Sequence, residues 1–586
     1  MSEKVEEFDA VVVGSGFGGS VISYRLADAG FNVCLLERGK AYPPNSFPRT
    51  PHDLGKNFWD PSEGLYGMFN VWSFKGSGGL VSAGLGGGSL IYANILARKD
   101  EKWFKYDLPD GTTRDWPLSY ADLDSHYTIV ERMMNAQRYP IAYEPYSDTP
   151  KTNAMQEAAF VLNGSGTPCE WVPLNLAVSF RRDAVDPPAQ NSPDNPAIVG
   201  SNLSDTREHY HEHVLNRKMP RSTCRLCGEC NIGCNYGSKN TLDYTYITEA
   251  WRKGAEIRPL SEVKWIARTD DGYELEYVVH DPDCEPGTEN PRRRIRCKTL
   301  VLAAGTFGTP YLLMKKESKI PGLSNELGKR YSVNGDLLSF ISKSIEEKNG
   351  TDVPRRLDPS FGPVITCGIR FPDDLDENGK HGRGFYVEDG GHPAMMSWLA
   401  EVSGLPGFLA RSVKFLKLAA KYRIGVANDA DIGGEVADLI GDAQTTLSTF
   451  PILTMGRDIA SGKLFLNEDR LDCDWKIADS KEYFDRVRNA GKAIAEVLRA
   501  EYQDNPSYKL NFQQVLTAHP LGGCAMGTDI HEAVVDKNCE VFGNPGLFVV
   551  DGSVMPSAVG PNPSLTIAAI ADHAADHIVN TRKPGP

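Results

Sequence analysis

The segment FDAVVVGSGFGGSVISYRLADAGFNVCLLERG, residues 8–39, restricts the fold of this chain more than any other part of the sequence. Its continuous apolar run at 10–13 is typical of a strand that is buried on both faces. The spacing G-x-G-x-x-G follows at once and opens a helix, with its glycines at Gly14, Gly16 and Gly19. In a dinucleotide-binding turn the first glycine makes the tight turn, the second lets the backbone approach a pyrophosphate, and the third lets the helix pack closely on the strand.

A second strand, expected at 32–36, ends in Glu37, at the distance from the glycines where dinucleotide-binding units carry an acid. A carboxylate there can accept a hydrogen bond from a ribose 2′-hydroxyl and disfavours a 2′-phosphate. A glycine triplet alone would indicate no more than a tight turn. The order strand, glycines, helix, strand and acid therefore predicts a Rossmann-like dinucleotide site, without distinguishing NAD from FAD.

Charge and apolar content exclude two classes of protein. The 586 residues carry a formal net charge of −14, whereas a nucleic-acid surface needs clustered basic residues, so we expect no nucleic-acid partner. No apolar run approaches the roughly 18 residues of a membrane-spanning helix. The N-terminal residues lack the basic start and the cleavage site of a secretory signal, so we expect a cytoplasmic protein whose 12 cysteines are reduced thiols or ligands.

A glycine-rich loop is expected within KGSGGLVSAGLGGGSLIYANI, residues 75–95. The loop contains Gly84, Gly86, Gly87, Gly88 and Ser89. This composition suits neither a packed helix nor a strand, and a flexible linker is one interpretation. Because apolar residues flank the loop on both sides, we expect instead a buried turn that lies against a flat ligand.

Two more segments extend the nucleotide-binding pattern. TLVLAAGTFGTPYLLM, residues 299–314, predicts a buried strand, a glycine turn at Gly305 and a helix, which together form a second βα unit. Near the C-terminus an apolar run predicts a strand that ends at Asp551 and Gly552. A helix then begins at Pro563, and its N-terminus offers a further site for a phosphate or a flavin carbonyl.

With its motifs GSGFGG, GLGGGSL, HPLGGC and VVDGS…GPNPSLTI in this order, the sequence resembles the glucose–methanol–choline (GMC) oxidoreductases, in particular their cholesterol-oxidase-like branch. The resemblance implies an α/β, two-domain flavoprotein fold. A discontinuous, Rossmann-like FAD-binding domain would comprise 1–110, 221–320 and 510–586. An α+β substrate-binding domain with a β-sheet would comprise 111–220 and 321–509.

The resemblance also implies the cofactor FAD and the class of reaction. We expect hydride transfer from a secondary alcohol to flavin N5, on a bulky apolar substrate such as a sterol, steroid or terpenoid, giving a ketone. Oxygen or another acceptor would then take the electrons. Two alternatives stay open: a redox-neutral lyase or isomerase on the same scaffold, and a dehydrogenase that passes electrons to a partner through a cysteine-ligated cluster.

Three residues are candidate catalytic groups under this resemblance. His519, in AHPLGGC, offers an imidazole as the base that accepts the hydroxyl proton, and Asn562, in VGPNPS, offers an amide that can donate to the substrate oxygen. Glu388, in GFYVEDGG, is the candidate for the carboxylate that moves a proton when a sterol double bond shifts. Each also has an ordinary structural interpretation: a hydrogen-bonded histidine beside a proline, an Asx turn that caps the last helix, and a solvated carboxylate in a turn.

The expected FAD contacts come from the same segments, with the backbone near Val263 beside the adenine. They are Gly14, Gly16, Gly19, Glu37, Gly86, Gly87, Gly88, Ser89, Asn94, Val263, Gly305, Asp551, Gly552 and Pro563. One departure lies beside the expected flavin, because Tyr92 stands where the sterol oxidases have an asparagine, and Asn94 comes two residues later. This change weakens a specific assignment to cholesterol.

The segment CRLCGECNIGC has cysteines at C-x2-C-x2-C-x3-C spacing, the run with which bacterial ferredoxins hold an iron–sulfur cluster. Asn235 stands where the ferredoxin run has proline, and the sequence has no second cysteine run. We therefore expect no bound metal and interpret Cys224, Cys227, Cys230 and Cys234 as reduced thiols packed near the FAD-binding domain. A cluster is the alternative.

The segment PGFLARSVKFLKLAAKYRIG, residues 406–425, predicts an amphipathic helix with a basic face. An ordinary surface helix is the simpler interpretation. Peripheral contact with an anionic bilayer, which would admit an apolar substrate, is the alternative.

Overall fold

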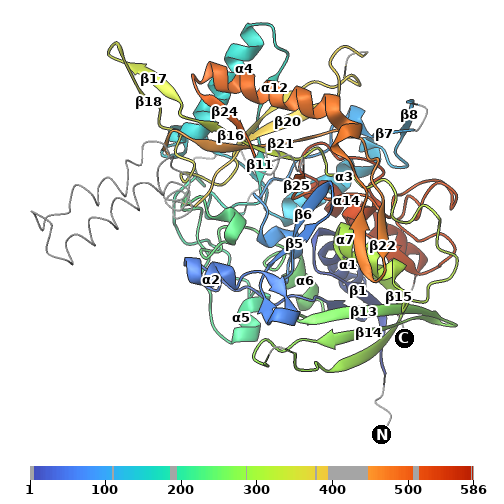
Figure 1. Cartoon of the computed structure of the whole chain (residues 1–586). Helices are drawn as coiled ribbons and strands as arrows, with labels where there is room; N and C mark the ends of the chain where they lie inside the picture. The colour runs from blue at the N-terminus through green and yellow to red at the C-terminus, as the bar shows by residue number, and fades with distance from the viewer. Residues whose placement is uncertain are drawn as a thin grey trace, which may run out of the picture.

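The computed structural model describes residues 5–108, 111–184, 194–285, 287–376, 379–393, 447–505, 514–582 and 584. Two large β-sheets organise these residues, one of seven strands and one of six. Figure 1 shows the seven-stranded sheet on the side of the molecule where both chain ends lie, and the six-stranded sheet on the opposite side, next to helices α4 and α12. The predicted α/β class is confirmed.

The seven-stranded sheet joins segments that are far apart in the sequence. Its order is β12-β2-β1-β15-β14-β13, and β26 pairs with β15. The strands are β1 (Glu6–Val13), β2 (Val33–Leu36), β12 (Glu256–Arg258), β13 (Ser261–Thr269), β14 (Gly272–Val279), β15 (Arg292–Leu302) and β26 (Leu547–Val549). Strand β1 lies parallel to β2 and to β15, whose last residues lie parallel to β26. The expected N-terminal, middle and C-terminal segments therefore meet in one sheet.

Helices follow the parallel strands, as the glycine turns predict. Helix α1 (Phe17–Asp28) follows β1, α7 (Gly305–Met314) follows β15, and α14 (Ser564–Thr581) ends the described C-terminal segment. Helix α1 contacts both α14 and α6 (Tyr246–Arg252). Helix α3 (Tyr120–Met133), in the range that we assigned to the substrate-binding domain, packs against α14.

The six-stranded sheet is antiparallel, in the order β10-β19-β20-β21-β16-β24. Its strands are β10 (Glu170–Pro173), β16 (Leu337–Ser342), β19 (Cys367–Phe371), β20 (Phe385–Asp389), β21 (Phe450–Gly456) and β24 (Glu501–Asp504). Helices α4 (Pro150–Gly164) and α12 (Lys481–Val497) pack on this sheet, and Figure 1 shows them at its outer side.

Strand register decides which side chains of this sheet face away from its helices. Val387, Ile452 and Leu337 belong to one buried apolar cluster with residues of α12. Side chains alternate between the two faces of a sheet, so Glu388 points to the opposite face. It pairs in register with Leu453 of β21. The sheet thus carries an apolar face under its helices and presents Glu388 on the other.

A smaller sheet positions two predicted motifs together. Strand β6 (Ser77–Ser82) leads into the glycine-rich loop, and β25 (Val515–Thr517) leads to His519. These strands pair in parallel, and β5 (Phe69–Ser73) completes the sheet on the other side of β6. Because parallel strands end at the same edge, His519 and the glycine-rich loop follow from neighbouring strand ends.

The remaining elements are short. They are β3 (Trp59–Asp60), β4 (Leu65–Tyr66), β7 (Lys105–Asp107), β8 (Thr113–Asp115), β9 (Gln137–Arg138), β11 (Asn175–Leu176), β17 (Ile345–Lys348), β18 (Thr351–Pro354), β22 (Leu464–Asn467), β23 (Arg470–Cys473), α2 (Pro51–Gly55) and α5 (Tyr210–Leu215). None of the described helices combines the length and the apolar character needed to cross a bilayer. The basic helix predicted at 406–425 lies outside the described residues.

Candidate active site

The N-terminal glycine turn brings backbone next to open space at the start of α1. Gly14 has a φ of +101°, in the left-handed region that favours glycine. A Cβ at Gly19 would lie 1.9 Å from the carbonyl oxygen of Gly14, so glycine is required for this close packing. A Cβ at Gly16 would meet no atom within 4 Å. The turn therefore has the tight packing and the free space that the G-x-G-x-x-G spacing predicts.

Glu37 is buried where β2 ends. Its Oε2 accepts hydrogen bonds from the backbone N–H (3.1 Å) and the hydroxyl (2.6 Å) of Ser15, and its Oε1 accepts one from the N–H of Gly39 (2.9 Å). Burial raises the pKa of Glu37. The N–H of Ser261 donates to the carbonyl oxygen of Glu37 (2.7 Å), so β13 starts beside this acid, with Val263 two residues further on.

The glycine-rich loop packs directly on the N-terminal turn. A Cβ at Gly87 would lie 2.6 Å from the Cα of Gly16, whereas a Cβ at Gly88 would meet no atom within 4 Å. Gly86 and Gly87 are buried, and the hydroxyl of Ser89 donates to the carbonyl oxygen of Gly86 (2.7 Å). The expected buried turn is confirmed, and the interpretation as a flexible linker is wrong because contacts with the first glycine loop fix this segment.

Asp551 joins the end of β26 to the start of α7. Its Oδ1 accepts from the N–H (2.8 Å) and the hydroxyl (2.6 Å) of Ser553, and its Oδ2 accepts from the N–H of Gly305 (2.9 Å) and the hydroxyl of Thr309 (2.5 Å). Burial raises the pKa of Asp551, and the hydrogen bonds from these donors reduce the size of that increase. Gly552 is equally confined, because a Cβ there would lie 2.9 Å from Oγ1 of Thr306. Four donors thus fix the second βα turn.

His519 is held by a buried aspartate. Its Nδ1 lies 2.9 Å from Oδ1 and 3.0 Å from Oδ2 of Asp336, which is 1% exposed. Oδ2 of Asp336 also accepts from the hydroxyl of Thr517 (2.8 Å) and the N–H of Ala518 (2.9 Å). When Nδ1–H donates to the carboxylate, Nε2 carries the lone pair. The aspartate therefore sets both the orientation of the ring and the nitrogen that can accept a proton.

Asn562 is paired with Glu388. Its Nδ2 donates to Oε2 of Glu388 (3.4 Å), and its own Oδ1 is buried without a hydrogen-bond partner. Helix α14 begins after Pro563 without any side-chain cap. The interpretation of Asn562 as an Asx cap of the last helix is therefore wrong, because its amide points to the neighbouring sheet.

Glu388 lies at the fourth position of β20 and is 1% exposed, so the interpretation as a solvated turn carboxylate is wrong. Side chains alternate along β20, so Glu388 points away from α12 and is buried against Asn562. Burial raises the pKa of Glu388 well above its ordinary value, the hydrogen bond from Asn562 lowers it, and the nearby charges of Asp389 and Asp336 raise it further. These surroundings favour the protonated acid.

The segment 332–336, directly before β16, connects the two pairs. Asn334 donates to the carbonyl oxygens of Gly560 (3.2 Å) and Pro561 (3.3 Å) and accepts from the N–H of Gly560 (3.0 Å). It therefore fixes the backbone before Asn562, two residues from the aspartate that holds His519. Sequence reasoning missed both Asn334 and Asp336. The available signal is the polar run SVNGD at the start of an apolar strand.

These residues fit the FAD that the resemblance implies. Open space borders Gly16 and Gly88, and Oδ1 of Asn562 is buried without a hydrogen-bond partner. The first glycine turn would hold the pyrophosphate, Glu37 the ribose, and the glycine-rich loop with the N-terminus of α14 the flavin. Asn94 differs, because its side chain lines a cavity formed by the cysteine run.

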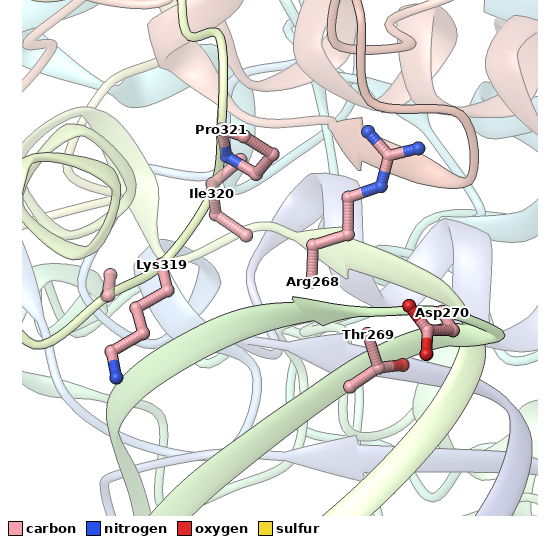
Figure 2. A pocket seen from close by; sticks show the side chains of 7 residues that line it. Arg268, Thr269, Asp270, Lys319, Ile320 and Pro321 are labelled. Atoms are coloured by element: carbon pink, nitrogen blue, oxygen red, sulfur yellow. The ribbon is translucent and has the colours of Figure 1, made fainter.

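A shallow hollow of about 490 Å³ lies elsewhere on the molecule, between the end of β13 and the segment 318–321. Figure 2 shows the side chains of Arg268, Asp270 and Lys319 around it. Its lining contains none of the predicted site residues.

Glu388→Gln is expected to raise the melting temperature at pH 8 more than at pH 5. The folded protein keeps the proton on Glu388 to higher pH than the unfolded chain, so this acid lowers stability progressively as the pH rises above its ordinary pKa of 4.5. Glutamine keeps the size and removes that effect. Glu262→Gln is the control: it should lower the melting temperature by a similar amount at both pH values, because His280 and Lys264 hold the pKa of Glu262 at about 2 and the stabilising effect of its charge is nearly complete at pH 5. An equal shift of Glu388→Gln at both pH values would contradict the buried protonated acid.

Comparisons with known proteins agree with this geometry. Residues 208–330 and 461–571 match the family models described as GMC oxidoreductase, and residues 12–70 match that of an NAD(P)-binding Rossmann-like domain. The chain is 30% identical to a cholesterol oxidase of Mycobacterium tuberculosis over 97% of this chain and 90% of that protein. It is 24% identical to a long-chain-alcohol oxidase of Arabidopsis thaliana over 98% of this chain and 67% of that protein.

A solved structure shares the fold at lower identity. The crystal structure of pyridoxine 4-oxidase from Mesorbium loti matches with a TM-score of 0.56 and 17% identity, over 98% of this chain and 99% of that chain. Together with the two glycine turns and the His519 and Asn562 segments, these similarities decide the family. The chain belongs to the GMC oxidoreductases, in their cholesterol-oxidase-like branch, and is an FAD-dependent oxidoreductase that acts on alcohols.

Proposed function

We propose that this protein oxidises a secondary alcohol on a bulky apolar substrate, a sterol, steroid or terpenoid, to a ketone. The observation that carries the proposal is a pair of hydrogen bonds to buried carboxyl groups, from His519 to Asp336 and from Asn562 to Glu388, linked by the segment 332–336. Alcohol oxidation needs an acceptor for the hydroxyl proton and a polar group that holds the oxygen, and these two pairs supply one of each.

His519 is the proposed base. Its Nε2 accepts the hydroxyl proton of the substrate, while Asp336 stabilises the positive charge that then forms on the ring. The amide of Asn562 orients the substrate oxygen, and its position is fixed by Glu388 and by Asn334. FAD, when bound, supplies the two-electron acceptor that takes the hydride from carbon.

Glu388 has a proposed second role with substrates whose double bond is separated from the new ketone by one carbon. Its ionised form would take a proton from that carbon and return it to the far carbon of the double bond, and the raised pKa of this buried carboxyl makes it a stronger base than a solvated carboxylate. This argument favours a sterol with a Δ5 double bond, which would shift to Δ4. Tyr92, the departure beside the expected flavin, keeps cholesterol itself from being singled out.

The substrate class is tested with a panel of hydroxysteroids, terpenols and long-chain primary alcohols. We expect the secondary hydroxysteroids or terpenols to bleach the flavin in the absence of oxygen at least about tenfold faster than the primary alcohols, because the apolar ring system supplies binding energy that orients the carbinol. Analysis of the product by mass spectrometry and ultraviolet absorbance distinguishes a Δ4 from a Δ5 ketone. Turnover while the flavin stays oxidised would instead support a redox-neutral lyase or isomerase.

The acceptor and the compartment belong to the same proposal. We propose oxygen or another acceptor for the electrons, in line with the relatives named oxidases. None of the 12 cysteines forms a disulfide, which supports the proposal of the cytoplasm as the compartment. Peripheral contact with a membrane through 406–425 remains a proposal that rests on the sequence pattern alone.

A further inference from the structure

The cysteine run closes around one small cavity, next to the glycine-rich loop. Its lining includes Cys224, Cys227, Cys230, Cys234, Asn94 and Lys239, and the free space is about 20 Å³. In ferredoxins with two clusters, the fourth cysteine of this run binds the second cluster. Here Cys234 lines the same cavity as the other three. The run therefore needs no distant partner motif to supply four sulfurs to one site.

The backbone is shaped to direct an N–H group at a cysteine sulfur. The N–H of Leu226 lies 3.4 Å from Sγ of Cys224. Leu226 adopts a φ of +57°, which a residue with a branched side chain rarely adopts. The N–H of Gly228 donates to the carbonyl oxygen of Gly362 (2.9 Å). The N–H of Gly362 in turn donates to the carbonyl oxygen of Leu226 (3.1 Å). A strained conformation held in place in this way is typical of a binding site.

Two more sulfurs receive backbone N–H groups. The N–H of Glu229 donates to the sulfur of Cys227, and the N–H of Val364 donates to that of Cys230. Hydrogen bonds to the sulfurs are a regular feature of iron–sulfur sites, where they tune the charge on the ligands.

Asn94 gives an independent indication of a ligand. It is 0% exposed, and neither its amide nitrogen nor its amide oxygen makes a hydrogen bond of ordinary geometry. Its side chain lines the same cavity as Cys230. A buried amide without partners destabilises the fold unless a group in the cavity pairs with it.

Positive charge balances the site. Nζ of Lys239 donates to the carbonyl oxygens of Cys230 (2.9 Å), Leu90 (3.0 Å) and Tyr92 (2.8 Å), and Arg225 also lines the cavity. Four thiolates bound to a metal centre leave net negative charge, which these cations offset. Because Leu90 and Tyr92 belong to the segment that begins with the glycine-rich loop, Lys239 ties the cysteine cavity to the expected FAD site.

The arrangement favours a cluster over a single metal ion. Across the described residues, no three histidine, cysteine or acidic side chains are gathered closely enough to hold one ion. A single zinc would need all four sulfurs about 2.3 Å from one point. A multi-iron cluster spreads its ligands further apart, which suits four sulfurs that surround one cavity without meeting at one point. Binding would widen the present free space of about 20 Å³. We propose that Cys224, Cys227, Cys230 and Cys234 together bind one iron–sulfur cluster.

The test uses the full-length flavoprotein, purified without oxygen and incubated with ferrous iron, sulfide and a thiol reductant. We expect about four iron and four acid-labile sulfide per chain, as for a four-cysteine [4Fe–4S] centre, with broad visible absorbance beyond the flavin bands. Cys230→Ser and Cys234→Ser should each retain less than about half of that iron, because each removes one of four ligands. Cys284→Ser, at an exposed cysteine outside the run, is the matched control and should match the wild type.

Two results would overturn the proposal: iron in the wild type no higher than in a Cys230→Ser, Cys234→Ser double variant, or one zinc per chain without sulfide. Flavin content and the melting temperature of every sample identify a variant that has failed to fold, and Cys227→Ser then replaces it. Anaerobic flavin reduction by alcohol is recorded on the same samples. Failure of the proposed alcohol oxidation and failure of the cluster are therefore separate outcomes.

Discussion

His519→Gln is expected to slow the anaerobic reduction of the flavin by substrate at least about a hundredfold. Glutamine has a similar reach and can still hydrogen-bond to Asp336, but it cannot accept a proton near neutral pH. Without a base, the hydroxyl proton must leave to water while hydride leaves carbon, which raises the barrier. Stopped-flow absorbance of the oxidised flavin at saturating alcohol measures the rate directly.

The matched control is His531→Gln, at an exposed histidine of the same C-terminal segment. It should leave the rate unchanged, and both variants should retain the flavin, because neither residue is among the expected FAD contacts. A His519→Gln protein that reduces its flavin at the wild-type rate would refute the role of this residue as the base.

Asp336→Asn is expected to lower the maximal rate by at least about a hundredfold while changing the substrate KM little. Oδ2 of Asp336 accepts from the hydroxyl of Thr517 and the N–H of Ala518, so an asparagine would keep its oxygen there. Its NH2 group would then face Nδ1 of His519. A donor at this place forces the proton onto Nε2, and the ring can no longer accept the substrate proton.

Asp458→Asn controls for the loss of a buried negative charge from the same region. Asp458 accepts from the hydroxyl of Ser332 and the N–H of Val333 and has no contact with His519 among its hydrogen bonds. We expect it to keep the rate within about fivefold of the wild type. Equal losses in the two variants would show that the packing of segment 332–336, rather than the tautomer of His519, decides the rate.

The parts of the fold that depend on neighbours in sequence could be predicted well. The glycine turn between β1 and α1 needs only a buried strand, spaced glycines and a helix within one stretch of chain. The amino-acid sequence of residues 8–39 shows all three patterns. The same holds for β15 with α7 and for the start of α14. Steric requirements at Gly14 and Gly19 leave few other arrangements.

The partners of the candidate catalytic residues could not be predicted in this way. His519 and Asp336 are 183 residues apart, and neither segment has a sequence pattern that predicts this pairing. The burial of Glu388 depends on the register of β20 with β21, which the sequence of β20 alone does not determine. Its position in GFYVEDGG predicts a solvated turn, because one acidic residue and two glycines come directly after it. Long-range pairing therefore limits what single segments reveal about the site.

During synthesis, β26 is the last strand to join the seven-stranded sheet, long after its neighbour β15 has been made. The place of β26 beside β15 stays empty while the ribosome makes the roughly 240 residues between them, on the order of 10 to 50 seconds at ordinary speeds. During this interval only residues 300–302 of β15, beyond the part that β14 covers, present an unpaired apolar edge. Until the C-terminal segment is made, this short edge is a place where another extended segment of the chain can pair wrongly.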